Sequence, residues 1–188
     1  MREIIAKILQ VPKWYGIGVI LLYSLLVAEF FSSINKLFIQ TELVNNDILI
    51  IFSRISYVVM ILSGVIVWII STFLFHLTAL LFDGKSSFGR FLFVSSYPYL
   101  IPVIMIFVGL FLLDEIQIPN SEDTMAFLKD NQTFKLSTTL INYSFIPYYL
   151  IIVVLIRYIH QIKYIYALLS VIIPVLSIWL ITMLFKLI

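Results

Sequence analysis

Two histidines, His76 and His160, carry the side chains best suited to chemistry in this chain. Imidazole and carboxylate groups are zinc ligands, so the two histidines could hold a metal together with Asp83. The histidines do not form an i,i+4 pair, however, and no third ligand is obvious in the sequence. We therefore expect no metal and no cofactor, and we interpret both histidines as hydrogen-bonding groups near the membrane surface.

The sequence lacks the usual motifs of enzymes. Gly84-Lys85-Ser86 resembles the end of a phosphate-binding loop, but Ala79 stands where that motif needs its first glycine. The chain has no cysteine. It also has no Ser-His-Asp arrangement, no HExxH motif and no pair of carboxylates within one apolar run. We therefore predict that this protein is not an enzyme.

Glu29 is a carboxylate inside a long apolar run. Charge in such a position is costly, so it marks a functional or structural site with a partner. Arg54 lies at the start of the next run, directly before the expected span 55–82, and is about as far from the connection near Thr41 as Glu29 is. A helical hairpin places both residues at similar depth, so we predict a Glu29–Arg54 ion pair. The pair would lock two helices together. The alternatives are an ion or proton role, or a Glu29 side chain that simply reaches the outer surface.

Composition places these residues in a membrane. Of the 188 residues, 62% are hydrophobic and 12% are charged, whereas a soluble domain has about 25% charged residues. The net charge is only +2. The sequence also contains no run of basic residues, so nucleic acid is not an expected partner. The expected surroundings are membrane lipid and other proteins of the membrane.

Five apolar runs are long enough for a membrane span, which needs about 20 residues. Lipid leaves backbone groups no water to bond, so each span should be a helix. We predict an all-α bundle of five transmembrane helices in a single membrane domain, residues 1–188, with a short interfacial segment at 1–13. The expected spans cover residues 14–34, 55–82, 91–113, 140–156 and 166–185. Prolines predict kinks in helices 3–5, at Pro98, Pro102, Pro147 and Pro174.

Basic residues in the short connections indicate the orientation, because cytoplasmic loops are enriched in Lys and Arg. One side of the predicted topology carries Arg2, Lys7, Lys13, Lys85, Arg90, Arg157 and Lys163. We therefore predict a multi-pass protein of the cell membrane with its N-terminus in the cytoplasm and its C-terminus outside.

Small residues share one face of the first and fifth runs, a pattern that lets helices approach closely. They are Ser24, Ala28 and Ser32, and Ala167, Ser170, Pro174 and Ser177. We interpret these faces as packing inside the bundle, with homo-oligomerisation as the alternative.

Two stretches of the chain carry a family resemblance. Residues 76–91 read HLTALLFDGKSSFGRF and precede Tyr97, Pro98 and Pro102, and residues 156–161 read IRYIHQ and precede an Ala-Leu-Leu segment and Pro174. These motifs and their order resemble the bacterial branch of the YIP (Ypt-interacting protein) family. The resemblance covers about residues 50–185. The chain departs from the family pattern at Asp83, where members often carry Gly, and at Lys163-Tyr164, where a turn containing Gly is common.

The resemblance implies a non-enzymatic membrane adaptor or assembly protein. Eukaryotic members bind prenylated small GTPases, which bacteria lack, so fold and topology carry over and that partner does not. Some bacterial relatives accompany ABC-type exporters or take part in protection against peptide toxins. The implied partner is thus another membrane protein, such as an ABC-type transporter component. It would dock on two inner loops, through Asp83, Lys85, Arg90, Arg157, His160 and Lys163.

Two other functions stay open. A small transporter or channel would place a polar cavity between the kinked spans 3–5, lined by Ser95, Ser96, Tyr99, Asn142, Ser144 and Tyr148. A toxin-immunity protein would set the acidic loop 114–137 against cationic peptides, through Asp114, Glu115, Glu122 and Asp123.

Overall fold

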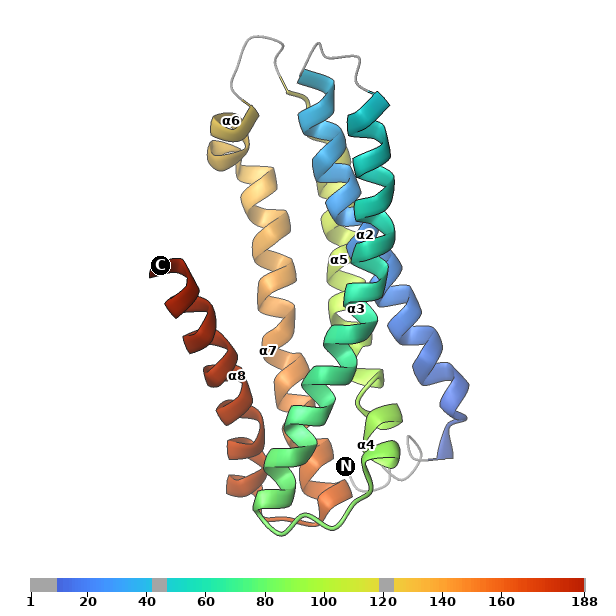
Figure 1. Ribbon diagram of the computed structural model, residues 1–188, viewed down its shortest axis with the longest axis vertical. Coiled ribbons are helices and arrows are strands. Elements are labelled where there is room, and N and C mark those ends of the chain that lie inside the picture. Colours follow the sequence, from blue (N-terminus) through green and yellow to red (C-terminus); the bar gives the residue numbers. More distant parts are fainter. Residues whose placement is uncertain (1–9, 42–46, 119–123, 188) are drawn as a thin grey trace. The chain divides into compact units, whose positions relative to one another are not determined.

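A computed structural model describes residues 10–41, 47–118 and 124–187, with side chains left out at 38–50 and 186–187. No strand occurs within these ranges, and the all-α prediction is confirmed. The elements, drawn in Figure 1, are α2 (Lys13–Thr41), α3 (Asp47–Leu81), α4 (Phe88–Val94), the 3-10 helix η1 (Tyr97–Tyr99), α5 (Leu100–Asp114), α6 (Thr124–Asp130), α7 (Gln132–His160) and α8 (Tyr164–Leu187).

Five segments are long and apolar enough to cross a membrane, as the sequence predicts. They are Lys13–Leu37, Ile51–Leu81, Phe88–Asp114, Gln132–His160 and Tyr164–Phe185. The fourth begins at Gln132, eight residues before the expected start at Leu140. Its first two turns read QTFKLSTT and are mostly polar, so the helix begins before the apolar run from which the span was predicted.

The third span is interrupted. It consists of α4, the 3-10 turn at Tyr97–Tyr99 and α5. Pro98 lies inside the 3-10 turn, and Pro102 lies in the first turn of α5, where a missing N–H leaves no hydrogen bond unmade. In contrast, α7 and α8 are continuous helices through Pro147 and Pro174. Kinks in helices 3–5 stay a prediction.

The described residues form two compact units. The first unit contains residues 10–19, 66–98 and 148–187, and the second contains residues 20–41, 47–65, 99–118 and 124–147. The helices α2, α3 and α7 contribute residues to both units. The single membrane domain therefore stays a prediction, and each unit is described by itself below.

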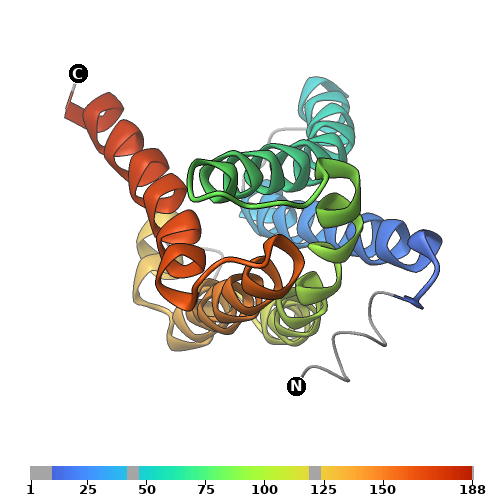
Figure 2. The same cartoon turned by 90° about the horizontal axis from the view of Figure 1, so that it is seen from below.

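The core of the first unit is built from α3, α4, α7 and α8. Ala79, Phe91, Ile156 and Ala167 are all fully buried, one from each of these helices. Figure 2 shows the turn between α3 and α4 beside the turn that follows α7. The two neighbouring turns at this end of the first unit thus pack against an apolar core.

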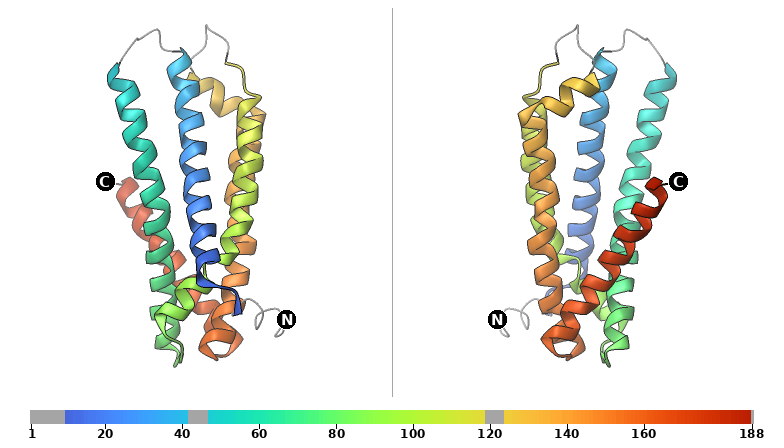
Figure 3. Two further views of the ribbon diagram at one scale, coloured as in Figure 1. Left: turned by 90° about the vertical axis from the view of Figure 1, so that its right-hand side faces the viewer. Right: turned by 90° about the vertical axis from the view of Figure 1, so that its left-hand side faces the viewer.

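Small residues allow close packing in the second unit. A Cβ added at Gly64 of α3 would lie 2.9 Å from Cβ of Ser24 on α2, and Ser24 is fully buried. Ser137 of α7 donates a hydrogen bond of 3.0 Å to the carbonyl of Gly109 on α5, and the two helices lie side by side in Figure 3. Ser24 and Ala28 are buried, which agrees with a packing role for the small residues of the first span.

Candidate functional site

A polar stripe runs along α3 in the first unit. Trp68, Thr72 and His76 are spaced four residues apart, so they share one face of the helix. The indole N–H of Trp68 donates to Oγ of Ser95 at 3.2 Å, and the hydroxyls of Thr72 and Ser95 are 2.9 Å apart. These bonds satisfy polar groups that are buried in an apolar core.

The stripe ends at a buried pair of histidines. Nδ1 of His76 lies 3.5 Å from Nε2 of His160, and the two ring centroids are 5.1 Å apart. The exposed fraction is 6% for His76 and 0% for His160. The rings of Phe88 and Phe91 pack against the pair. The first unit therefore brings together the two histidines of the chain, 84 residues apart, as interacting groups.

The pair lies directly under the turn between α3 and α4. The backbone N–H of Lys85 donates to the carbonyl of His160 at 3.2 Å. A Cβ added at Gly84 would lie 2.8 Å from Nδ1 of His160 and 2.7 Å from the carbonyl oxygen of Ala79. Only a glycine leaves room for this approach. Asp83 and Gln161 adopt positive φ values of 62° and 59°, so each turn reverses through a left-handed residue.

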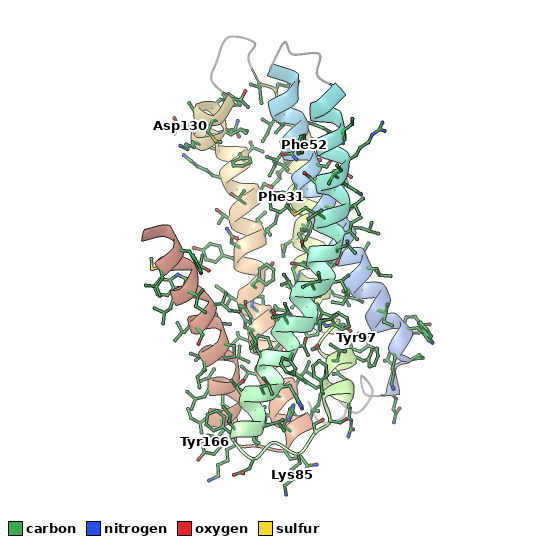
Figure 4. The ribbon with its side chains drawn as sticks, viewed as in Figure 1. Phe31, Phe52, Lys85, Tyr97, Asp130 and Tyr166 are labelled. Atoms are coloured by element: carbon green, nitrogen blue, oxygen red, sulfur yellow. The ribbon has the colours of Figure 1, made fainter. Side chains whose placement is uncertain are left out.

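We refer to residues 82–90 and 157–163 as the loop surface. Five of the six predicted docking residues are exposed on it: Asp83, Lys85, Arg90, Arg157 and Lys163. Lys85 and Tyr166 lie at the same end of the first unit in Figure 4. The guanidinium of Arg157 lies 5.8 Å from the ring of Tyr164, and the rings of Phe82 and Tyr166 stack at 5.1 Å.

The prediction of His160 as a docking residue is wrong. Its side chain is fully buried and contacts His76 and Phe91. A histidine beside a polar turn suggested exposure, but the end of α7 points it into the core. His160 therefore supports the loop surface from below.

The two histidines would need at least one further ligand to hold a metal ion. Within the described ranges, no three His, Asp or Glu side chains are close enough to coordinate one ion. Asp83 is exposed, whereas both histidines are buried. The hypothetical zinc set of His76, His160 and Asp83 is thus not assembled there.

The predicted Glu29–Arg54 ion pair is also wrong. In the second unit, Oε1 of Glu29 lies 3.3 Å from Nζ of Lys36 on the same helix. Seven residues are close to two full turns, so the two side chains share a face of α2. The part of the chain that the structure describes shows no ion pair for Arg54. Glu29 and Lys36 line a cavity of about 410 Å³ together with Asp114.

The residues proposed for a transport cavity are divided between the units. Ser95, Ser96 and Tyr148 belong to the first unit, and Tyr99, Asn142 and Ser144 belong to the second. Ser96 and Ser144 donate to backbone carbonyls three residues earlier, those of Phe93 and Ile141. Ser95 bonds to the stripe of α3. Asn142 lines a cavity of about 290 Å³ in the second unit, with Thr138 and mainly apolar neighbours.

The acidic loop is described only in part. Asp114 and Glu115 are exposed at the end of α5, and Glu122 and Asp123 lie outside the described residues. Asp130 lies 3.9 Å from Lys135. Arg2 and Lys7 of the predicted interfacial segment also lie outside the described residues.

Trp68 and Thr72 are the site residues that sequence reasoning missed. The four-residue spacing of Trp68, Thr72 and His76 was the available signal, because it aligns hydrogen-bonding groups on one face of an otherwise apolar helix.

Comparison of the chain with protein-family models, with curated proteins and with solved structures finds no match.

Proposed function

We propose that this protein is a non-enzymatic adaptor or assembly protein of the cell membrane, similar to the YIP family, which docks another membrane protein on its loop surface. One observation carries the proposal. The hydrogen bond from the N–H of Lys85 to the carbonyl of His160 joins two turns, far apart in sequence, into one surface. The partner class suggested by the family resemblance is an ABC-type transporter component, in export or in toxin resistance.

The chemistry of the first unit agrees with a docking role. Several of its buried polar groups bond to one another, Trp68 and Thr72 to Ser95 and His76 to His160, while Nδ1 of His160 is buried without a hydrogen-bond partner among the described residues. Its exposed charges gather on the loop surface instead, and recognition between proteins is steered by such charges. A rigid support beneath exposed charges is what a docking surface requires.

Photo-crosslinking in native membranes tests the proposal. A photoreactive amino acid is placed in turn at Lys85, at Lys163 and, as a control in the second unit, at Leu136, which is 50% exposed. We expect Lys85 and Lys163 to give an adduct of the same mass that Leu136 does not give. Arg157→Glu should remove that adduct from both positions. Different adducts at the two turns, or an adduct unaffected by Arg157→Glu, would contradict a shared docking surface.

A small transporter or channel is the second candidate. The cavity in the second unit favours it, because Asn142 and Thr138 provide polar groups among apolar walls. Asn142→Leu would then abolish uptake or efflux in proteoliposomes. Crosslinking at the loop surface would be unchanged, which separates this candidate from the adaptor.

A further inference from the structure

A cavity of about 350 Å³ lies beside α4 in the first unit, and it shares Ser87, Gly89 and Arg90 with the loop surface. Its polar side is formed by Lys13, Ser87 and Arg90, and its apolar side by Val11, Phe93 and Val94. The hydroxyl of Tyr97, labelled in Figure 4, donates to the carbonyl of Pro12 at 3.3 Å. This bond holds the start of α2 against the cavity.

Within the described part of the chain, neither cation of this cavity forms an ion pair, so both can bind an anion. Among the described residues, the ion pairs are Lys36–Glu29 and Lys135–Asp130, both in the second unit. Nζ of Lys13 lies 5.2 Å from the ring centroid of Phe93, which orients the ammonium without neutralising it. The side chain of Ser87 makes no cap hydrogen bond to α4. One cavity thus offers two positive charges and a hydroxyl.

The position of the cavity in the sequence indicates the source of the anion. Lys13 is the first residue of one membrane-spanning segment, and Phe88, between Ser87 and Gly89, is the first residue of another. The cavity therefore lies where membrane spans begin, at the depth of lipid headgroups. Basic pockets beside membrane helices at this depth bind anionic headgroups. A free phosphate would use the cations but not the apolar wall.

We propose that this cavity binds the phosphodiester of an anionic phospholipid. Lys13 and Arg90 hold the phosphate, Ser87 donates a hydrogen bond to it, and an acyl chain lies along Phe93 and Val94. Two cations should favour an anionic lipid over a zwitterionic lipid with the same acyl chains by about 30-fold.

Native mass spectrometry of the full-length protein tests this site. The protein is released from detergent micelles that contain dioleoylphosphatidylglycerol or dioleoylphosphatidylcholine, and the retained lipid is counted. We expect one tightly retained phosphatidylglycerol and no comparable phosphatidylcholine. Lys13→Gln with Arg90→Gln should abolish the preference. Lys129→Gln with Lys135→Gln, which removes two charges outside the cavity, should preserve it.

Gly89 provides a test that does not depend on removing a cation. It lines the cavity, and a Cβ at this position would meet no atom within 4 Å. Gly89→Glu should therefore be tolerated and should expel the anionic lipid by charge repulsion, whereas Gly89→Ala should retain it.

Three results would overturn the proposal. One is equal retention of the two lipids by the unaltered protein. Another is a preference that persists in both the Lys13/Arg90 double variant and Gly89→Glu. The third is displacement by inorganic phosphate at the same concentration as the lipid, which would show that the apolar wall contributes nothing and that the ligand comes from water.

Discussion

Nδ1 of His76 lies 3.5 Å from Nε2 of His160, and this contact joins the ends of α3 and α7 within the first unit. One ring must donate the proton and the other must accept it, so the bond sets the tautomer of both histidines. His160 also accepts, through its carbonyl, from the N–H of Lys85. A single residue thus connects the buried stripe of α3 to the loop surface.

We expect the histidine pair to stabilise the first unit through coupling. His76→Leu or His160→Leu leaves one buried imidazole without its partner, which should lower the free energy of unfolding by about 1–3 kcal/mol. The double variant removes both polar groups, and it should recover about 0.6–1.7 kcal/mol relative to the sum of the single variants. Reversible unfolding in mixed micelles measures the free energy of unfolding of the two single variants and of the double variant. Strict additivity would show that the two rings do not interact.

Gly84, in the turn between α3 and α4, and Gly89, in the first turn of α4, should respond in opposite ways to replacement by alanine. Gly84→Ala puts a methyl group 2.7 Å from a backbone oxygen and 2.8 Å from His160, and such overpacking costs about 1–3 kcal/mol. Gly89→Ala meets open space inside α4, so the better helix propensity of alanine should add about 0.5–1 kcal/mol. Thermal unfolding in detergent compares the two. A neutral Gly84→Ala would contradict the close approach to His160.

Replacement of either left-handed residue, Asp83 or Gln161, by glycine should stabilise the protein. Asp83 and Gln161 have φ values of 62° and 59°, and relief of this strain by glycine should raise the free energy of unfolding by about 0.5–1 kcal/mol. The gain should be larger at Gln161, since Asp tolerates this conformation better.

Asp83→Val is the matched opposite and should be destabilising, because a β-branched residue fits this conformation poorly. A loss of stability in both glycine variants, measured by the same unfolding assay, would argue against these turn conformations.

The charged pair of α2 should be weakly coupled. The side chains of Glu29 and Lys36 are 42% and 62% exposed, so a double-variant cycle of Glu29→Gln and Lys36→Gln should give about 0.2–1 kcal/mol. The same cycle of Glu29→Gln with Arg54→Gln should be additive. Coupling to Arg54 in place of Lys36 would restore the pairing predicted from the sequence.

The spans could be predicted from sequence because lipid imposes a strong rule on composition. Twenty apolar residues need a helix, and the charged residues bound it. The rule gives the depth of a residue but not its direction around the helix axis. Depth alone predicts a pair of Glu29 with Arg54, whereas Lys36 is the partner because it shares a face of α2 with Glu29.

The candidate site was harder to predict for a related reason. The spacing of Trp68, Thr72 and His76 is visible in the sequence, but their partners Ser95 and His160 come from helices whose rotation depends on packing. The sequence predicts an exposed His160 because this residue lies at the edge of a polar inner loop. Its burial depends on the rotation of the last turn of α7, which no local pattern determines.

Orientation in the membrane is the last prediction, and the chain suits its measurement because it has no cysteine. Ser86→Cys lies on the loop surface, and Asp130→Cys lies at the end of α6, where residue 130 is exposed. Lys and Arg favour the cytoplasm, so an impermeant thiol reagent applied to intact cells should label Asp130→Cys but not Ser86→Cys. Both should be labelled after lysis, which controls for local accessibility. Labelling of Ser86→Cys alone in intact cells would invert the topology and place the loop surface, together with any partner, outside the cell.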